Sequence, residues 1–196
     1  MNDGVHPKHY IMKYKEWFLD HIKPGWIVLD VGCGTGMLPV VLAEKAAFVY
    51  AVEENKEHIA VARTQYTRPN IEYICADATT HNYNLCRPIN CVTMSNVLEH
   101  IEHRVDFLKK IACQLKWAEE NHKCFLFRVP IIDREWIVLY KKEMGLDYRL
   151  DPTHHIEYTL EQFEEEMKQA NIVIEQVVIR FGEIYAVCEK QKESKT

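Results

Sequence analysis

The sequence has no apolar run long enough to cross a bilayer, which takes about 18 or more consecutive apolar residues. Its first ten residues, MNDGVHPKHY, also lack the apolar segment of a secretory signal peptide. We therefore expect a soluble, cytoplasmic protein that does not span a membrane.

A surplus of basic residues is missing as well. The formal net charge is −5, whereas proteins that bind nucleic acid broadly usually carry an excess of lysine and arginine. The seven cysteines form an odd set without a pair at C-x-x-C spacing, so we predict buried thiols in a reducing compartment. Nucleic acid is not an expected partner.

Strand-like and helical segments alternate up to residue 129, and such alternation is typical of a parallel sheet covered on both faces. The length of 196 residues suits a single domain, 1–196. A helical pattern at 10–22 comes first and ends at Pro24. Strands are expected at 26–31, 47–53, 71–76, 89–94 and 123–129, and helices at 36–46, 55–66 and 103–119.

The pattern changes after Pro130. We expect a helix at 133–144, then an irregular stretch, and a helix to residue 170 that starts at a capping box of Thr159 and Gln162. Strands at 172–180 and 183–188 with a two-residue link predict a closing antiparallel hairpin. The fold class is therefore α/β: a Rossmann-like, doubly wound, seven-stranded and mostly parallel sheet with a C-terminal antiparallel hairpin.

Three glycines stand at alternate positions in VLDVGCGTGML, directly after the first strand. A dinucleotide-binding turn has the spacing G-x-G-x-x-G, and its third glycine would fall at Met37. That glycine lets helix and strand pack closely beside a pyrophosphate. Its absence lowers the expectation of a phosphate ligand, although the tight turn still needs Gly32, Gly34 and Gly36.

Two acidic residues follow the next two strands. Glu53 ends the second strand, where its carboxylate can accept hydrogen bonds from both ribose hydroxyls. Asp77 follows the third strand, where it can accept from the amine of an adenine. Either one alone could be structural, Glu53 as a helix cap and Asp77 as a turn residue. Together they predict a nucleoside with a cationic, non-phosphate tail at the carboxyl edge of the sheet.

The segments VLDVGCGTG, AVEEN, ICADAT and CVTMSNVLEHI follow in order. In sequence and spacing they resemble class I S-adenosylmethionine-dependent methyltransferases, in particular small stand-alone members. The resemblance implies S-adenosylmethionine as cofactor, with the ribose at Glu53. It further implies cofactor contacts from the residues of the first turn and of the third and fourth strand ends, which are Gly32, Cys33, Gly34, Gly36, Asp77, Ala78 and Asn96.

The resemblance also extends to the opening segment HPKHYIMKY. It implies that an N-terminal helix within 1–24 covers the cofactor, with His9, Tyr10 or Tyr14 forming a lid. Core packing is the alternative for Tyr14.

The methyl acceptor must be sought elsewhere. The fourth strand is followed by SNVLEH, without the proline pair of nucleobase amine methyltransferases, and no proline in the chain precedes a cysteine. Methylation of nucleic-acid bases is therefore not expected. In similar small methyltransferases the residues between the fifth strand and the final hairpin form the substrate wall. We expect such a substrate-side insertion at 130–160.

Within this insertion the stretch DPTHHIEYT, 151–159, holds the catalytic candidates. An alcohol nucleophile benefits from a base near neutral pKa, which favours histidine. His154 is the first candidate base and His155, with Glu157, the second. A purely structural role of His154 is the alternative. Further residues could bind a polar acceptor or cap the helix at 133: Arg128, Asp133, Arg134 and Trp136.

A metal is not expected. His100 and His103 stand at helical spacing and could share an ion, but no further ligand cluster accompanies them in the sequence. A packed or solvated pair is the preferred interpretation.

Together these observations predict methyl transfer from S-adenosylmethionine to a small molecule, at a hydroxyl of a sugar, glycolipid precursor or natural product. The alternatives are N-methylation of a small amine or protein side chain and an inactive cofactor-binding scaffold. A nicotinamide oxidoreductase is disfavoured by Met37. The expected partner is the small-molecule substrate, and the chain is expected to be a monomer or homodimer.

Overall fold

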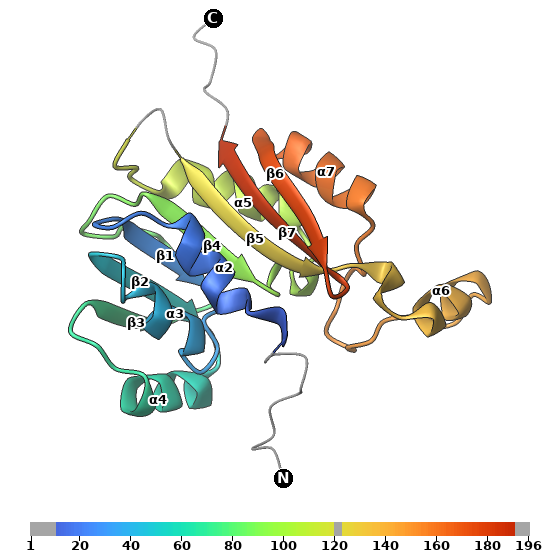
Figure 1. The fold of residues 1–196 in the computed structure, drawn as a ribbon, viewed down its shortest axis with the longest axis horizontal. Coiled ribbons are helices and arrows are strands. Elements are labelled where there is room, and N and C mark those ends of the chain that lie inside the picture. Colours follow the sequence, from blue (N-terminus) through green and yellow to red (C-terminus); the bar gives the residue numbers. More distant parts are fainter. Residues whose placement is uncertain (1–10, 120–122, 191–196) are drawn as a thin grey trace, which may run out of the picture.

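The structure is a computed structural model that describes residues 11–119 and 123–190 (Figure 1). Its centre is a seven-stranded sheet in the order β3-β2-β1-β4-β5-β7-β6. β1 to β5 pair in parallel, and β7 pairs antiparallel with both β5 and β6. The predicted fold class is confirmed. The strands are β1 (Ile27–Val31), β2 (Phe48–Glu53), β3 (Ile71–Cys75), β4 (Cys91–Ser95), β5 (Cys124–Pro130), β6 (Ile172–Arg180) and β7 (Glu183–Lys190).

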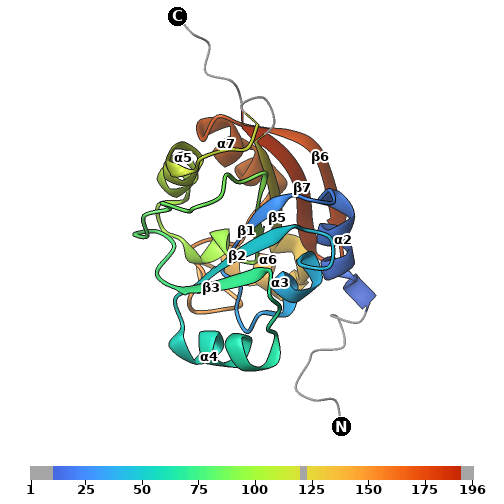
Figure 2. The same ribbon diagram turned by 90° about the vertical axis from the view of Figure 1, so that its left-hand side faces the viewer.

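Helices cover both faces of this sheet, as Figure 2 shows with α5 and α7 on one side and α2 and α3 on the other. Alternate residues of β1 explain the layering, because Val28 packs among α2 and α3 side chains while Leu29 packs with those of α5 and α7. The helices are α2 (Tyr14–His21), α3 (Met37–Leu42), α4 (Lys56–Gln65), α5 (Arg104–Gln114), α6 (Trp136–Glu143) and α7 (Leu160–Gln169), with 3-10 turns η1 (Leu98–His100) and η2 (Ile132–Arg134). None of these described helices is both long and apolar enough to span a bilayer.

The predicted capping box and the closing hairpin are confirmed. Thr159 with Gln162 forms the full capping box of α7, and Asn55 caps α4 by accepting from two backbone amides. The β6–β7 link is Phe181-Gly182, and Gly182 has φ of 73°. There a Cβ would lie 2.3 Å from that of Arg134, so glycine is required.

The helix predicted at 103–119 ends early, at Gln114. The chain then turns back and pairs with the residues before β4: the Ile89 amide donates to the Lys116 carbonyl at 2.7 Å, and the Ala118 amide donates to the Ile89 carbonyl at 2.9 Å. Tertiary hydrogen bonds thus replace the last helical turn, and Ile89 lies in an isolated bridge instead of in the strand predicted at 89–94.

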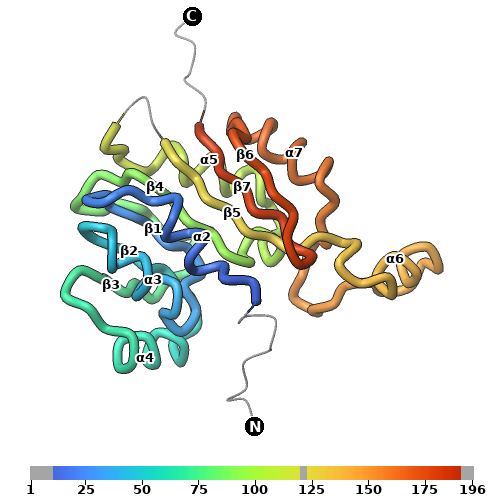
Figure 3. The backbone as a smooth tube through the Cα atoms, in the orientation of Figure 1, coloured from blue at the N-terminus to red at the C-terminus, as the bar shows by residue number. Residues whose placement is uncertain are grey.

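The helix predicted at 133–144 is divided in two. Residues of η2 form a 3-10 turn, Glu135 is extended with φ of −140°, and α6 follows. Figure 3 shows α6 standing away from the sheet, beyond the β6–β7 turn. The helix predicted at 36–46 is likewise shorter, because single turns replace it after Leu42.

A buried carboxyl group lies in the middle of the sheet. Asp30 of β1 is 1% exposed and accepts a hydrogen bond from the Thr93 hydroxyl of β4 at 2.6 Å. Its Oδ2 has no partner among the described residues. Burial raises the pKa of Asp30 to about 7, and the hydrogen bond from Thr93 opposes the shift in part.

This group makes the stability of the fold depend on pH. The folded pKa of Asp30 is raised above its unfolded value of 3.8, so its contribution is fully present below pH 4 and is lost as pH rises to about 7. The free energy of unfolding of Asp30→Asn, relative to that of the native chain, should rise by about 1.4 kcal/mol per pH unit in this window. Urea denaturation of both proteins between pH 4 and 8 measures this difference in the free energy of unfolding. A difference that does not change with pH would contradict the raised pKa of Asp30.

Candidate active site

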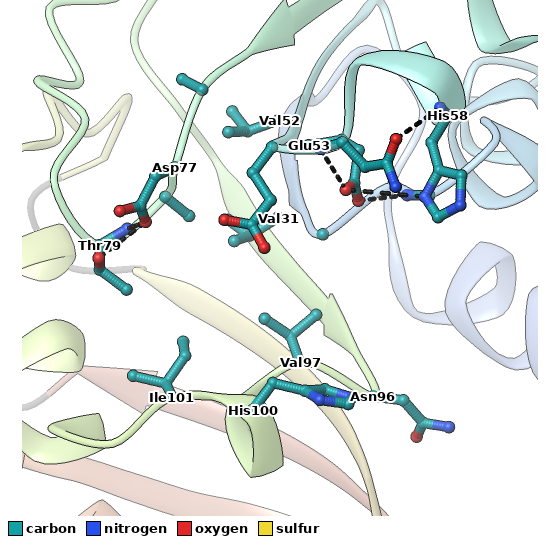
Figure 4. Close-up of a pocket in the computed structure, with 16 residues that line it drawn as sticks. Val31, Val52, Glu53, His58, Asp77, Thr79, Asn96, Val97, His100 and Ile101 are labelled. Carbon is teal, nitrogen blue, oxygen red and sulfur yellow. Dashed lines mark hydrogen bonds and ion pairs between the residues drawn. The ribbon is translucent and has the colours of Figure 1, made fainter. Parts of the chain in front are cut away.

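A cavity of about 440 Å³ opens at the carboxyl ends of β1 to β4 (Figure 4). In parallel sheets this edge is where ligands bind, because the strand order reverses there and the adjacent loops diverge. Figure 4 shows Asp77 and Thr79 on one side, Glu53 with His58 on a second, and Asn96 with His100 on a third. The walls also include Gly32, Gly34, Glu54, Asn55, Ala78, Val97 and Ile101.

The glycine turn divides its three glycines between two tasks. Gly32 and Gly34 line the cavity, and Gly34, with φ of +53°, has no atom within 4 Å of where a Cβ would stand. Gly36 has φ of +93° and faces α4 instead, where a Cβ would lie 2.7 Å from the Tyr73 hydroxyl. The contact predicted between Gly36 and the cofactor is therefore not supported by the geometry, which gives this glycine a packing role. Its missing side chain lets α4 approach the turn.

Cys33 lies in the turn but is also absent from the lining of the cavity. The residue is 6% exposed and packs with Ala51, Ile59 and Ala62 under α4. Burial, followed by the nearby carboxylates, raises the pKa of its thiol well above the usual range. The side chain is thus a neutral packing element, and only its backbone belongs to the turn.

Glu53 ties the turn to the end of β2. Its Oε2 accepts from the Gly34 amide at 3.0 Å and its Oε1 accepts from the Asn55 amide at 2.9 Å. His58 approaches the same carboxylate, with Nδ1 3.7 Å from Oε1. A carboxylate has about four acceptor positions, so Glu53 can still accept from ligand hydroxyls in the cavity that it lines.

Asp77 is more fully engaged than the sequence suggested. Its Oδ1 accepts from the Thr79 amide at 2.8 Å and the Thr79 hydroxyl at 2.7 Å, and its Oδ2 accepts from the Thr80 hydroxyl at 3.2 Å. These hydrogen bonds, the one from the Thr79 hydroxyl first, lower the pKa of Asp77 and keep it ionised. Ala78 lies beside it in the cavity wall.

Asn96 stands at the far wall in the left-handed region, with φ of 55°. When its amide is oriented to suit both neighbours, the oxygen accepts from Arg128 Nη2 at 3.0 Å and the nitrogen donates to Glu183 Oε2 at 3.2 Å. Arg128 also forms a buried ion pair with Glu183 and stacks on the Tyr14 ring at 4.2 Å. Glu183 could not be identified from sequence patterns, because its strand pairs with β5 only in the folded chain.

The histidines are arranged in an unexpected order. His100 lines the cavity, whereas the first catalytic candidate, His154, lies behind it with the ring centroids 4.7 Å apart. His154 is 6% exposed, and its Nδ1 lies 2.8 Å from Glu157 Oε1. His155 is exposed and touches this region only through its amide, which donates to the Glu99 carbonyl at 2.7 Å.

Glu99 is the residue that the sequence reasoning missed. It follows β4 within η1, where an acidic residue is normally solvated, yet it is 1% exposed. Its Oε2 has no hydrogen-bond partner within the described part of the chain. Burial raises the pKa of Glu99 to about 8, and the pKa of His100 is lowered by burial and by His154.

Parts of the proposed lid can be placed. His9 and Tyr10 lie outside the described residues. Tyr14 is half-buried against Arg128 and is not among the residues that line the cavity, which matches the packing alternative stated for it.

Several methyltransferases are similar to this chain. Residues 28–117 match a family model described as a methyltransferase domain. Over 112 residues the chain is 32% identical to the ubiquinone biosynthesis O-methyltransferase of Aliivibrio fischeri (strain MJ11). The aligned region covers 52% of this chain and 48% of that protein. Over 115 residues the chain is 28% identical to N-methyltransferase 4 of Papaver somniferum. This aligned region covers 56% of this chain and 31% of that protein. The chain thus spans about half the length of these relatives or less.

A solved structure shares the fold over almost the whole chain. Magnesium protoporphyrin IX methyltransferase from Synechocystis PCC 6803, solved with bound SAH (S-adenosylhomocysteine), superimposes with a TM-score of 0.67 at 17% sequence identity. The match covers 94% of this chain and 83% of that one.

The different roles of Gly34 and Gly36, one lining the cavity and the other packing against α4, can be tested by substitution. Gly34→Ala should cost about 1–2 kcal/mol of stability, from the positive φ alone. Gly36→Ala should cost about 3 kcal/mol in total, because its new methyl also meets Tyr73 and Ala62. Urea denaturation of the two variants compares them, and equal stabilities would contradict the packing role of Gly36.

Glu53→Ala should weaken binding of S-adenosylhomocysteine by about 10- to 100-fold, because one or two charge-assisted hydrogen bonds are lost. Glu57→Ala is the matched control, since Glu57 is an exposed glutamate of α4 outside the cavity. Titration calorimetry measures both affinities, with thermal melting to confirm folding. An unchanged affinity of the Glu53 variant would remove this residue from the cofactor site.

Proposed function

We propose that this chain is a class I S-adenosylmethionine-dependent methyltransferase with S-adenosylmethionine as its cofactor, and that it methylates a hydroxyl group of a small molecule; the match to a methyltransferase domain model and the fold shared with a methyltransferase support this. The observation that carries the choice of a hydroxyl is His100 in the cavity wall with the His154–Glu157 pair behind it. A neutral hydroxyl must lose its proton during methyl transfer, whereas a neutral amine attacks with its own lone pair. Groups that manage a proton therefore matter most for an oxygen acceptor.

We assign the parts of the cofactor to three walls of the cavity. The adenine belongs beside Asp77 and Ala78, and the ribose hydroxyls belong at Glu53. The methionine part then lies along the turn of Gly32 and Gly34. This assignment follows the order of the strand ends and leaves the sulfonium facing Asn96 and His100, where the third wall stands.

Methyl transfer is an in-line displacement at carbon. The acceptor oxygen forms a bond to the methyl carbon while the bond from that carbon to sulfur breaks, and the electron pair stays on sulfur. The leaving group is neutral, so the protein gains most by aligning the two reactants. The acceptor proton leaves toward the histidines, and His154, oriented by Glu157, stays our candidate for the group that activates the hydroxyl.

Within this class we propose a polar acceptor, such as a sugar, a glycolipid precursor or a natural product. The O-methyltransferase among the relatives supports oxygen as the target atom. The N-methyltransferase among them supports the second candidate, methylation of a small amine. We further propose that the chain acts in the cytoplasm on a free small molecule, without nucleic acid, as a monomer or homodimer.

The proposal is tested by binding and turnover together. Calorimetry should show binding of S-adenosylhomocysteine and none of NAD, because the turn lacks the third dinucleotide glycine. S-adenosylmethionine should then be consumed with a panel of phenols and sugars but not with matched amines, as followed by release of S-adenosylhomocysteine. Turnover of amines alone would replace the oxygen acceptor by nitrogen. Cofactor binding without turnover of either panel would contradict the enzymatic proposal and favour a scaffold, and NAD binding alone would overturn the cofactor assignment.

A further inference from the structure

Three side chains converge at the wall of the cavity that holds His100, the acceptor wall, where we place the methyl acceptor. Glu99 and His100 come from η1 and His154 comes from the 151–159 loop, and one ligand atom from each lies within 4.8 Å of the others. We propose that these three residues form a divalent metal site. Two imidazoles and one carboxylate are a donor set that Zn²⁺ uses in catalytic sites, where further positions stay open for water or substrate.

The hydrogen bonds of His100 and His154 leave the Nε2 atom of each ring available to bind a cation. The Thr153 hydroxyl donates to Asp151 Oδ1 at 2.7 Å, so it accepts from His100 Nδ1 at 2.8 Å. His154 Nδ1 donates to the Glu157 carboxylate at 2.8 Å. Both rings therefore carry their proton on Nδ1, and the lone pair of each Nε2 is free to bind a cation.

Glu99 supplies the second, independent observation. It is 1% exposed, and its Oε2 has no hydrogen-bond partner among the described residues. A buried carboxyl oxygen without a partner is costly, and most buried polar atoms in proteins have a partner. A cation bound between Glu99 and the two histidines would provide that partner.

A neighbouring carboxylate orients one of the three side chains, His154, as is common for metal ligands. Glu157 holds the His154 ring from behind, and it is fixed in turn by the Leu150 amide at 2.9 Å and by Arg134 at 3.7 Å. A carboxylate that orients a histidine in this way is typical of metal sites. The amide of His155 donates to the Glu99 carbonyl, which brings the two segments together.

This site was not predicted from the sequence. The spacing of the two histidines had suggested His103 as the partner of His100. In the fold the third partner is His154 from a distant loop, and His103 is not part of the described cluster. A carboxylate next to a histidine on η1 gave the only local signal.

The role of the cation rests on the proposed function. His100 lines the cavity, so a cation on its Nε2 lies at the acceptor side. There an open position can take the hydroxyl oxygen and lower its pKa. With the cation bound, His154 serves as a ligand instead of as the base described above, so the proton leaves to solvent. The oxygen attacks the methyl carbon while the carbon–sulfur bond breaks and its electron pair stays on sulfur. The cation is not oxidised or reduced.

The test begins with metal binding alone. Protein stripped with EDTA is titrated with Zn²⁺ by calorimetry, and in parallel with Mg²⁺. One Zn²⁺ per chain is expected, with weaker Mg²⁺ binding because imidazole ligands favour Zn²⁺. Glu99→Gln and His154→Ala should each lower the Zn²⁺ affinity by about 100-fold or more, and Glu157→Gln by about 10- to 100-fold. His103→Ala is the matched control and should bind as the native chain does.

Equal Zn²⁺ binding by the native chain and Glu99→Gln, or no binding by the native chain, would overturn the site. Glu99→Gln keeps the shape of the side chain, and its thermal melting shows whether it is folded if His154→Ala is not. Zn²⁺ binding that depends on the cluster, without turnover of hydroxyl acceptors, would overturn the proposed function and support the site. Turnover of hydroxyl acceptors that persists in EDTA would overturn the catalytic role of the cation.

Discussion

The hydrogen bond from the Gly34 amide to the Glu53 carboxylate, 3.0 Å long, is the interaction on which the rest of the site depends. It fixes the turn after β1 against the end of β2. The amides of Gly32 and Cys33 reinforce it by donating to the Val52 carbonyl at 2.8 and 3.0 Å. Because β1 and β2 are parallel neighbours, both carboxyl ends meet at one edge of the sheet. A carboxylate that shapes the turn is thereby also presented to the ligand.

The acceptor wall is built in another way, from two segments far apart in the chain. The 3-10 turn after β4 and the 151–159 loop meet through the hydrogen bond between the His155 amide and the Glu99 carbonyl. Their side chains then form a polar cluster in which His154 is ordered by Glu157 and Glu99 keeps one unpaired oxygen. Such a cluster costs stability unless something satisfies it, which is the physical basis for assigning it a cation and a place in the chemistry.

Much of this could be predicted from the sequence, because the signals are local. The alternation of strands and helices gave the sheet, the Thr159 capping box gave the start of α7, and the strand ends placed Glu53 and Asp77 on the cavity. What could not be predicted depends on tertiary neighbours. The helix predicted at 103–119 ends early because residues 116–118 pair with Ile89. The packing role of Gly36 depends on Tyr73 and Ala62, which come close to it only in the folded chain.

A crystal structure of the chain with S-adenosylhomocysteine and Zn²⁺ would locate both the cofactor and the cation. We expect the ribose at Glu53, the sulfur facing Asn96 and His100, and Zn²⁺ at about 2.0–2.2 Å from the nitrogens of His100 and His154 and an oxygen of Glu99. A nucleoside bound elsewhere, or Zn²⁺ bound away from this cluster, would contradict these assignments.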